Sequence, residues 1–361
     1  MTQGRRAPET GVLVLGMHRS GTSAVARLVN LLGVPLSVPD DVTSRPALGN
    51  ASGHWESAAL RNFNDGLLRE LGGDVLGPPE LGPGWAQAVD PAVFERAQET
   101  FRSVYSTPVW VWKDPRNCIT LPFWREVLAA RPVCIVVHRN PLDVAASLKH
   151  RSEIAQALGL ALWDRYTRDL LRNLSGLPVL VGPYDDLVDD PLQWCTELSS
   201  FLTANGIFLG PFPDEAVLRF VDAGLRSFRA SPGAFDSDPL ISVPLRDIHK
   251  LLADLQGPHE SLPTPELPEP VGWMPALLAE RRERAVAERR AEALRNRLTT
   301  PPPAKKIARR QAAQADELRR QARKAEVLEA RLAQLHASRS FRYGRPLRVF
   351  AARARRLRTR R

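Results

Sequence analysis

The residues best suited to chemistry lie in Gly16–Ser23, which reads GMHRSGTS. A short apolar run, Val12–Gly16, is long enough for one buried strand, and apolar residues then recur at helical spacing over Val25–Leu32. A strand, a glycine-bearing loop and a helix, in this order, direct backbone N–H groups and a helix N-terminus toward one anion. The sequence therefore predicts a binding loop for phosphate or sulfate, formed by His18, Arg19, Ser20, Gly21, Thr22 and Ser23.

This loop differs from that of an ordinary nucleoside triphosphatase. The spacing of Gly16 and Gly21 matches a P-loop, but Thr22 stands where that motif has its lysine. Without the lysine, transfer of a terminal phosphoryl group lacks its usual charge clamp. Arg19 lies earlier in the loop, and a guanidinium can bind phosphate or sulfate through two N–H groups. The alternative interpretation is a plain strand–turn–helix whose arginine is solvated.

A second strand–helix junction also carries groups suited to an anion. The apolar run Val133–Val137 predicts a buried strand, and Asn140 followed by Pro141 predicts the start of a helix. Arg139 lies beside this helix N-terminus and Ser147 lies two turns along. The arginine, through a bidentate contact, and the serine, through its hydroxyl, can bind a terminal phosphate.

Both segments resemble those of the sulfotransferases that use 3′-phosphoadenosine 5′-phosphosulfate (PAPS). GMHRSGTS resembles their 5′-phosphosulfate loop, with arginine at Arg19 as in protein-tyrosine and some bacterial members. The segment from Arg139 to Ser147 resembles their 3′-phosphate site, and Tyr184, in the element YDDL, resembles a tyrosine near the nucleotide. The resemblance spans Val12–Asn205 and implies an α/β fold with a P-loop-like parallel sheet flanked by helices.

One departure from the family pattern concerns the region after this span. The soluble members close over the nucleotide with an RKGxxGxxK-like loop, which this sequence lacks. Arg226 and Arg229 are the nearest substitutes for it.

Glu56, Lys113, Arg19 and His54 are the candidates for proton transfer and charge stabilisation. Glu56 lies at the predicted start of a helix, whose N-terminus favours an ionised carboxylate, as a general base requires. Lys113 ends a predicted strand, where ligands of open α/β sheets bind. Its context WKDPR resembles the Lys-Asp-Pro segment of protein-tyrosine sulfotransferases, whose lysine helps to neutralise the leaving oxygens. His54 is an alternative base. A first-turn helix carboxylate and a surface turn with a local ion pair are the simpler interpretations of Glu56 and Lys113.

Charge is distributed unevenly along the 361 residues, whose formal net charge is +10. From Ala276 onward there are 26 Lys and Arg against 8 Asp and Glu, whereas the preceding part has 24 against 32. The predicted organisation is a sulfotransferase-like domain over 1–254, a proline-rich linker over 255–275, a helical extension over 276–336 and a basic tail over 337–361.

The extension and the tail each allow more than one interpretation. Leu318, Ala325 and Leu332 are seven residues apart, which favours a coiled coil and a homo-oligomer through 304–336, although a single solvated helix fits nearly as well. The tail interleaves arginines with aromatic and aliphatic residues, which suits an anionic membrane surface. It also resembles a short tail on bacterial enzymes that assemble surface polysaccharides. Binding of nucleic acid is a competing use of this charge, but no fold that reads nucleic acid accompanies the tail, so we predict no nucleic-acid partner. Solvated disorder is the third alternative.

The remaining features bear on compartment and function. Three cysteines without metal-ligand spacing and an N-terminus with only a short apolar run favour a cytoplasmic enzyme, in peripheral contact with the inner face of the membrane. We predict a PAPS-dependent sulfotransferase, with product PAP and no metal, acting on a hydroxyl of a glycan or glycolipid acceptor. A small-molecule kinase on the same fold and a membrane-docked scaffold with a vestigial nucleotide site are the alternatives.

Overall fold

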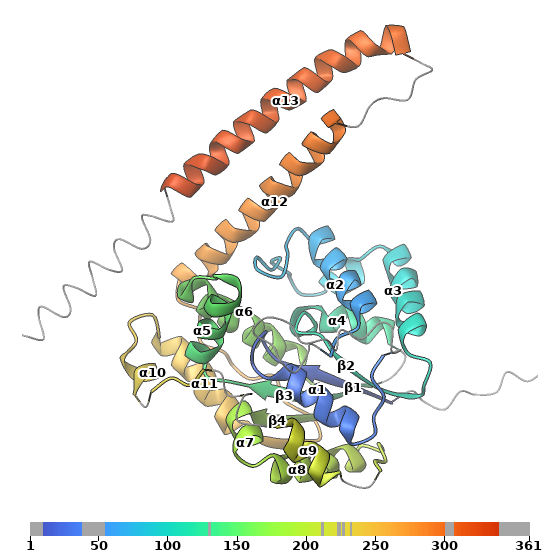
Figure 1. Ribbon diagram of the computed structural model, residues 1–361, viewed down its shortest axis with the longest axis vertical. Helices are drawn as coiled ribbons and strands as arrows, with labels where there is room; N and C mark the ends of the chain where they lie inside the picture. Colours follow the sequence, from blue (N-terminus) through green and yellow to red (C-terminus); the bar gives the residue numbers. More distant parts are fainter. Residues whose placement is uncertain are drawn as a thin grey trace, which may run out of the picture. The chain divides into compact units, whose positions relative to one another are not determined.

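The computed structural model describes residues 10–37, 55–128, 131–210, 213–221, 225, 228–231, 233–299 and 307–338 (Figure 1). The chain forms two compact units, the first of residues 1–71 with 80–278 and the second of residues 72–79 with 279–361. The predictions for His54, for Arg226 and for the tail beyond Ser338 lie outside the described residues.

The first unit is built on a five-stranded sheet in the order β2-β1-β3-β4-β5. The strands are β1 (Thr10–Leu15), β2 (Val109–Lys113), β3 (Val133–His138), β4 (Val179–Pro183) and β5 (Gly257–His259). The first four are parallel, and β5 is antiparallel to β4. From β1 the chain passes to β2 on one side and then to β3 on the other, so the strand order reverses between β1 and β3. Ligands of open α/β sheets bind outside the carboxyl ends of the strands at such a point.

Helices cover both faces of this sheet (Figure 1). On one face, strand residues such as Val12 and Ile135 share a core with α1 (Thr22–Leu31), α8 (Pro191–Ala204) and α9 (Asp214–Phe220). On the other face Trp112 of β2 packs edge-on against Trp124 of α4, with ring centroids 4.6 Å apart. This face is covered by α3 (Pro91–Val104), α4 (Asn117–Val127) and α6 (Gln156–Asn173). The predicted fold class, a P-loop-like parallel sheet flanked by helices, is confirmed.

The predicted helix starts are also present. Ser57 caps α2 (Ala58–Glu70) by accepting a hydrogen bond from the N–H of Leu60, and Asn140 caps α5 (Pro141–Ser152) by accepting one from the N–H of Leu142. The other elements of the first unit are η1 (Trp85–Ala88), α7 (Tyr184–Asp189), α10 (Ala234–Ser237) and α11 (Val243–Asp254). The segment 255–275, expected as a linker, supplies the edge strand β5, which sequence inspection did not find.

The second unit contains most of α12 (Trp273–Thr299), the whole of α13 (Ile307–Ser338) and the loop 72–79. The carboxylate of Glu329 accepts a hydrogen bond from Arg295 at 2.6 Å, which joins α13 to α12. In the loop, Asp74 accepts from two loop N–H groups and lies 3.5 Å from Arg289 and 3.9 Å from Arg281 of α12. The helical extension predicted over 276–336 is present as the two helices α12 and α13, and the coiled coil and the homo-oligomer stay predictions. Among the described residues no helix is apolar over enough length to cross a bilayer.

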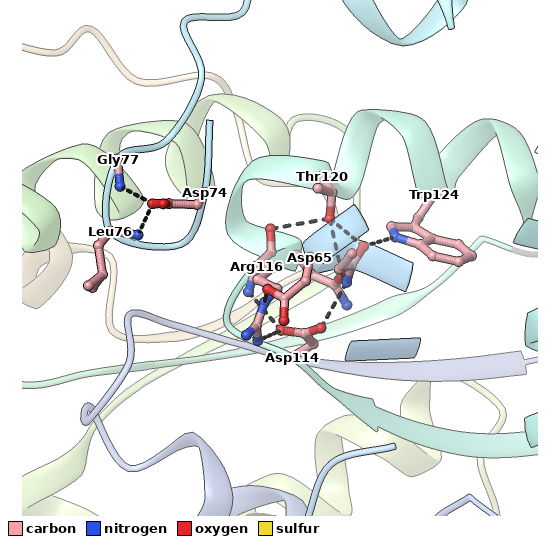
Figure 2. A network of polar contacts seen from close by, with 10 residues as sticks. Asp65, Asp74, Leu76, Gly77, Asp114, Arg116, Thr120 and Trp124 are labelled. Carbon is pink, nitrogen blue, oxygen red and sulfur yellow. Dashed lines mark hydrogen bonds and ion pairs between the residues drawn. The ribbon is translucent and has the colours of Figure 1, made fainter. Parts of the chain in front are cut away.

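A buried polar network fastens α2 to the segment that follows β2 (Figure 2). The side-chain amide of Asn64, which is fully buried, donates to Asp114 at 2.8 Å and to Asn117 at 2.9 Å. Its oxygen accepts from the indole N–H of Trp124 at 2.8 Å and from the hydroxyl of Thr120 at 3.3 Å. The amide therefore uses both its donors and its acceptor across one helix–helix contact.

We expect Asn64→Ala to lower the free energy of unfolding by about 3 kcal/mol or more, because it leaves several buried polar groups without partners. Urea denaturation of the full chain measures this change. Asn62→Ala, an exposed substitution on the same helix, is the matched control and should stay within about 0.5 kcal/mol of the original protein. Equal stability losses in the two variants would contradict the role assigned to the network.

Candidate active site

The loop after β1 has a backbone conformation that depends on its glycines. A Cβ at Gly16 would lie 2.4 Å from the carbonyl oxygen of Val137, so only glycine lets this loop approach the end of β3. Gly21, with φ of 99°, would place a Cβ 2.1 Å from the ring of Tyr184, which follows β4. Arg19 also has positive φ, at 72°. Left-handed residues among right-handed ones turn successive N–H groups toward one side, which forms an anion-binding concavity.

The start of α1 completes this concavity. Its N-cap is Gly21, and no side chain caps it. The first N–H groups of a helix have no partners within the helix and favour a bound anion. Two buried polar atoms of the loop, Ser20 Oγ and His18 Nε2, have no hydrogen-bond partner among the described residues. The loop therefore offers a hydroxyl, a ring nitrogen and a helix N-terminus to the oxygens of a phosphate or sulfate group.

The two predicted anion-binding segments meet at Arg19. Its Nε donates a hydrogen bond to the Oγ of Ser147, 128 residues away, at 2.9 Å. Burial, followed by the nearby positive charges of Arg151 and Arg139, lowers the pKa of Arg19 to about 10. Arginine remains charged at this pKa, so three cations share one region of the first unit.

Arg139 lies on the other side of the same region. Its guanidinium carbon is 4.8 Å from the centre of the Tyr184 ring, in a cation–π contact. Its Nε is 3.7 Å from the carboxylate of Asp143, and its Nη2 donates to the carbonyl of Phe228. Because Tyr184 also contacts the loop at Gly21, the two anion-binding segments adjoin one another.

Leu225, Phe228 and Ala230 contact the residues of this second binding position. The hydroxyl of Tyr184 donates to the carbonyl of Leu225 at 2.7 Å, and the N–H of Ala230 donates to Asp143 at 2.6 Å. Burial raises the pKa of Asp143, while this N–H, Arg139 and Arg229 act in the opposite direction. The side chain of Arg229 is thus close enough to act on Asp143, in a segment where the sequence offered it only as a substitute for the missing family loop.

Glu56 and Lys113 form a buried ion pair. The Nζ of Lys113, at the end of β2, is 2.5 Å from Oε1 of Glu56, which precedes the N-cap of α2. The lysine and glutamate side chains are 2% and 10% exposed. Lys113 pairs in register with Val14 of β1, which places it at the same edge of the sheet as the loop after β1.

The charges around this pair set the protonation states of the site. Burial alone raises the pKa of the Glu56 carboxyl, but the ammonium of Lys113, together with Arg116 and His18, outweighs burial and lowers this pKa to about 2. Burial, followed by Arg116, lowers the pKa of His18 to about 3. At neutral pH the site therefore holds an ionised glutamate and an uncharged imidazole.

Arg116 and Arg151 are two site cations that sequence inspection missed. Arg116 is held between Asp65 at 2.6 Å and Asp114 at 3.0 Å, as the close view shows (Figure 2). Burial lowers its pKa, and the two carboxylates more than compensate, so the net pKa is raised. Its charge acts on both His18 and Glu56. Arg151 had a recognisable signal, since it follows Ser147 by four residues and so shares its helix face.

Two further observations concern what else the described residues could bind. A cavity of about 240 Å³ lies beside β4, α7 and α8, and its wall includes the carboxylates of Asp186, Asp189, Asp190 and Glu197. An acidic wall repels phosphate and sulfate, so we do not place the anion site there. No group of three or more His, Cys, Asp or Glu side chains in the described part of the chain is arranged to hold a metal ion.

The geometry thus defines an α/β fold whose candidate anion site lies at the switch point between β1 and β3. No protein-family profile matches the chain, and no curated protein matches it significantly. Two of the solved structures that resemble it are sulfotransferase domains. One is from the olefin synthase of Synechococcus PCC 7002, with 18% identity, 78% of this chain and 97% of that one covered, and a TM-score of 0.36. Another is from the curacin biosynthetic pathway, with 16% identity, 76% and 98% covered, and a TM-score of 0.35. Likeness at this level says nothing about activity, so function has to be argued from the site.

Breaking the buried pair should cost stability. We expect Glu56→Leu and Lys113→Met each to lower the free energy of unfolding by about 3–5 kcal/mol, because each leaves a buried charge without its partner. The double variant, which removes both charges, should be more stable than either single variant. Urea denaturation of the three variants tests this, and costs that simply add would show that the two groups do not act as a pair.

Proposed function

We propose that this protein is a sulfotransferase that moves the sulfuryl group of PAPS to a hydroxyl of a carbohydrate, in a bacterial surface glycan or glycolipid. The observation that carries the proposal is the contact between Arg19 and Ser147, since it joins the two segments that resemble the family's two phosphate sites. The carbohydrate acceptor is inferred more indirectly, from the tail that resembles those of enzymes assembling surface polysaccharides.

The donor fits the groups available in the site. Its phosphosulfate end would be held by Arg19, by the N–H groups at the start of α1 and by the partnerless hydroxyl of Ser20. Its 3′-phosphate would be held by Arg139 and Ser147, with Arg151 as a further cation. PAPS supplies an activated sulfuryl group whose leaving group is a stable bisphosphate. The task of this chain is to hold the donor and the acceptor in line and to neutralise the developing charge.

Glu56 and Lys113 would take the two remaining roles, proton acceptance and charge stabilisation. The carboxylate of Glu56 accepts the proton of the acceptor hydroxyl as its oxygen attacks sulfur, and Lys113 stabilises the charge on the leaving oxygens. With Lys113 beside it, Glu56 is a weak base because its pKa is low. When the ammonium of Lys113 turns toward the anionic donor, Glu56 loses its closest cation. Its pKa then rises, and it becomes a stronger base at the moment when the donor is bound.

A small-molecule kinase, the rival enzyme on this fold, has less support from the site. A phosphoryl-transfer loop of the P-loop type places a lysine on the transferred phosphate. Here Thr22 occupies that position at the start of α1, and its side chain is buried.

Nucleotide binding tests the donor assignment directly. We expect PAP to raise the melting temperature of the full chain more than ATP with Mg²⁺ does, because two phosphate ends match two binding positions. Arg19→Ala and Ser147→Ala should each weaken PAP binding, the arginine variant by roughly 10- to 100-fold because it loses a charged hydrogen-bonding partner. Isothermal titration calorimetry measures these affinities.

The control for this series is Arg102→Ala, which removes an exposed arginine at the end of α3 and should leave PAP affinity unchanged. A larger thermal shift with ATP and Mg²⁺ than with PAP would favour the kinase. PAP binding without transfer of radiolabelled sulfate into any bacterial glycan extract would favour the scaffold.

The pH dependence of transfer tells the two candidate bases apart. Because the pKa of Glu56 is lowered to about 2, its carboxylate stays ionised as the pH falls, and kcat/KM should stay level from about pH 8 to 5. His18, with a pKa of about 3, adds no ionisation in this range. Transfer of radiolabelled sulfate at donor and acceptor concentrations well below their KM values measures the profile, because it then reports the protein before the donor binds. A fall in kcat/KM below about pH 6.5 that disappears in His54→Asn would assign the base to the histidine instead.

A further inference from the structure

The outward side of α13 carries a concentrated positive charge. Glu329 is bonded to Arg295 of α12, and Leu318, Ala325 and Leu328, on the same side of the helix, are buried or half-buried. With 100° between successive residues, the opposite side of the helix is centred on Val327, which is 66% exposed.

Basic side chains surround this exposed valine. Arg320, Lys324 and Arg331 lie on one flank of Val327 by helical period, and Arg323 lies on the other, and all four are exposed. No acidic residue between 319 and 331 lies on this side, since Glu329 turns to α12 and Glu326 lies at the edge. An exposed apolar side chain within a basic helix face is the arrangement found in helices that lie on membranes.

The sequence beyond Ser338 continues the same composition. Residues 339–361 contain ten arginines and no Asp or Glu, and among the arginines stand Phe341, Tyr343, Phe350 and three aliphatic residues, Leu347, Val349 and Leu357. Arginines attract anionic lipid headgroups, and aromatic side chains favour the boundary between headgroups and acyl chains.

We propose that the basic face of α13, formed by Arg320, Arg323, Lys324, Val327 and Arg331, docks on an anionic phospholipid bilayer. Charge complementarity supplies most of the attraction, at about fivefold in affinity per basic residue near the surface. The apolar residues favour a bilayer over a nucleic acid. A polyphosphate backbone gives no apolar boundary to a valine or to aliphatic side chains, whereas a bilayer does.

Vesicle flotation of the full chain tests this proposal. We expect the protein to float with phosphatidylcholine vesicles that contain about 30% phosphatidylglycerol, to stay behind with pure phosphatidylcholine, and to dissociate as salt is raised. Changing Arg320, Arg323, Lys324 and Arg331 together to Gln should weaken vesicle binding by on the order of a hundredfold. Glutamine is a good helix former, so α13 is retained, as circular dichroism can verify.

Two controls separate the proposed face from net charge and from general damage. Changing Arg69, Arg102, Arg219 and Lys250 to Gln removes the same charge from exposed positions of the first unit and should leave vesicle binding unchanged. Val327→Glu should weaken binding, whereas Val327→Ile should keep it.

Three outcomes would overturn the proposal. The first is equal flotation with neutral and anionic vesicles, and the second is equal loss of binding in the two charge-matched variants. The third is release of the vesicles by a DNA duplex at equal total phosphate, with Val327→Glu binding that duplex as well as the original protein does. That result would assign the basic face to nucleic acid. None of these measurements depends on sulfuryl transfer, so they are informative even if the proposed activity fails its own test.

Discussion

Repulsion among cations is the constraint on which this structure depends. The fold gathers these cations at the carboxyl ends of the parallel strands. Arg19, Arg139 and Arg151 are close enough for two of them to lower the pKa of the third. Like charges at such distances in a partly buried region are unfavourable unless an anion lies among them. The carboxylate of Asp143 lies 3.7 Å from one of these cations, Arg139, and the carbonyl of Phe228 accepts a hydrogen bond from the same arginine. A doubly phosphorylated ligand would add negative charge beside all three cations, so their mutual repulsion favours ligand binding.

The second charged group of the site is arranged differently, because its charges are paired. Glu56, which precedes the N-cap of α2, and Lys113, at the end of β2, belong to different segments, so no single helix or strand fixes their separation. Asn64 lies two turns further along α2 and joins it to the residues that follow Lys113. Because this amide is buried with all its partners, a shift of α2 along β2 would leave buried polar groups unpaired and would cost free energy. A neutral hydrogen-bond network thus positions the two segments that carry the ion pair. The ammonium of Lys113 can therefore move toward a bound anion without loss of this network.

What the sequence could predict follows from how local each signal is. A few adjacent residues determine each strand end, each of the caps Ser57 and Asn140, and the candidate anion-binding loop. Local patterns therefore predict these features. The role of Arg116 depends on Asp65, 51 positions away on another helix, and no local pattern announces such a partner. The strand β5 is three residues long and contains a proline and a glycine, so only its pairing with β4 defines it. Local sequence likewise does not announce that Asp74, in the loop 72–79, contacts arginines of α12 more than 200 residues away.

The part of the chain from Ala276 onward and the part before it carry opposite net charge. This difference bears on how the protein would approach the proposed bilayer. The basic and acidic residues number 26 and 8 from Ala276 onward, and 24 and 32 before it. An anionic surface attracts the first part and repels the second, whatever the geometry of the connection between them. The cations of the site are the exception within the acidic part, and they are buried or half-buried around the loop after β1 rather than spread over the surface. If both proposals hold, the basic extension meets the bilayer and a glycolipid acceptor in that bilayer is concentrated near the protein, which lowers the affinity that the acceptor pocket itself has to provide.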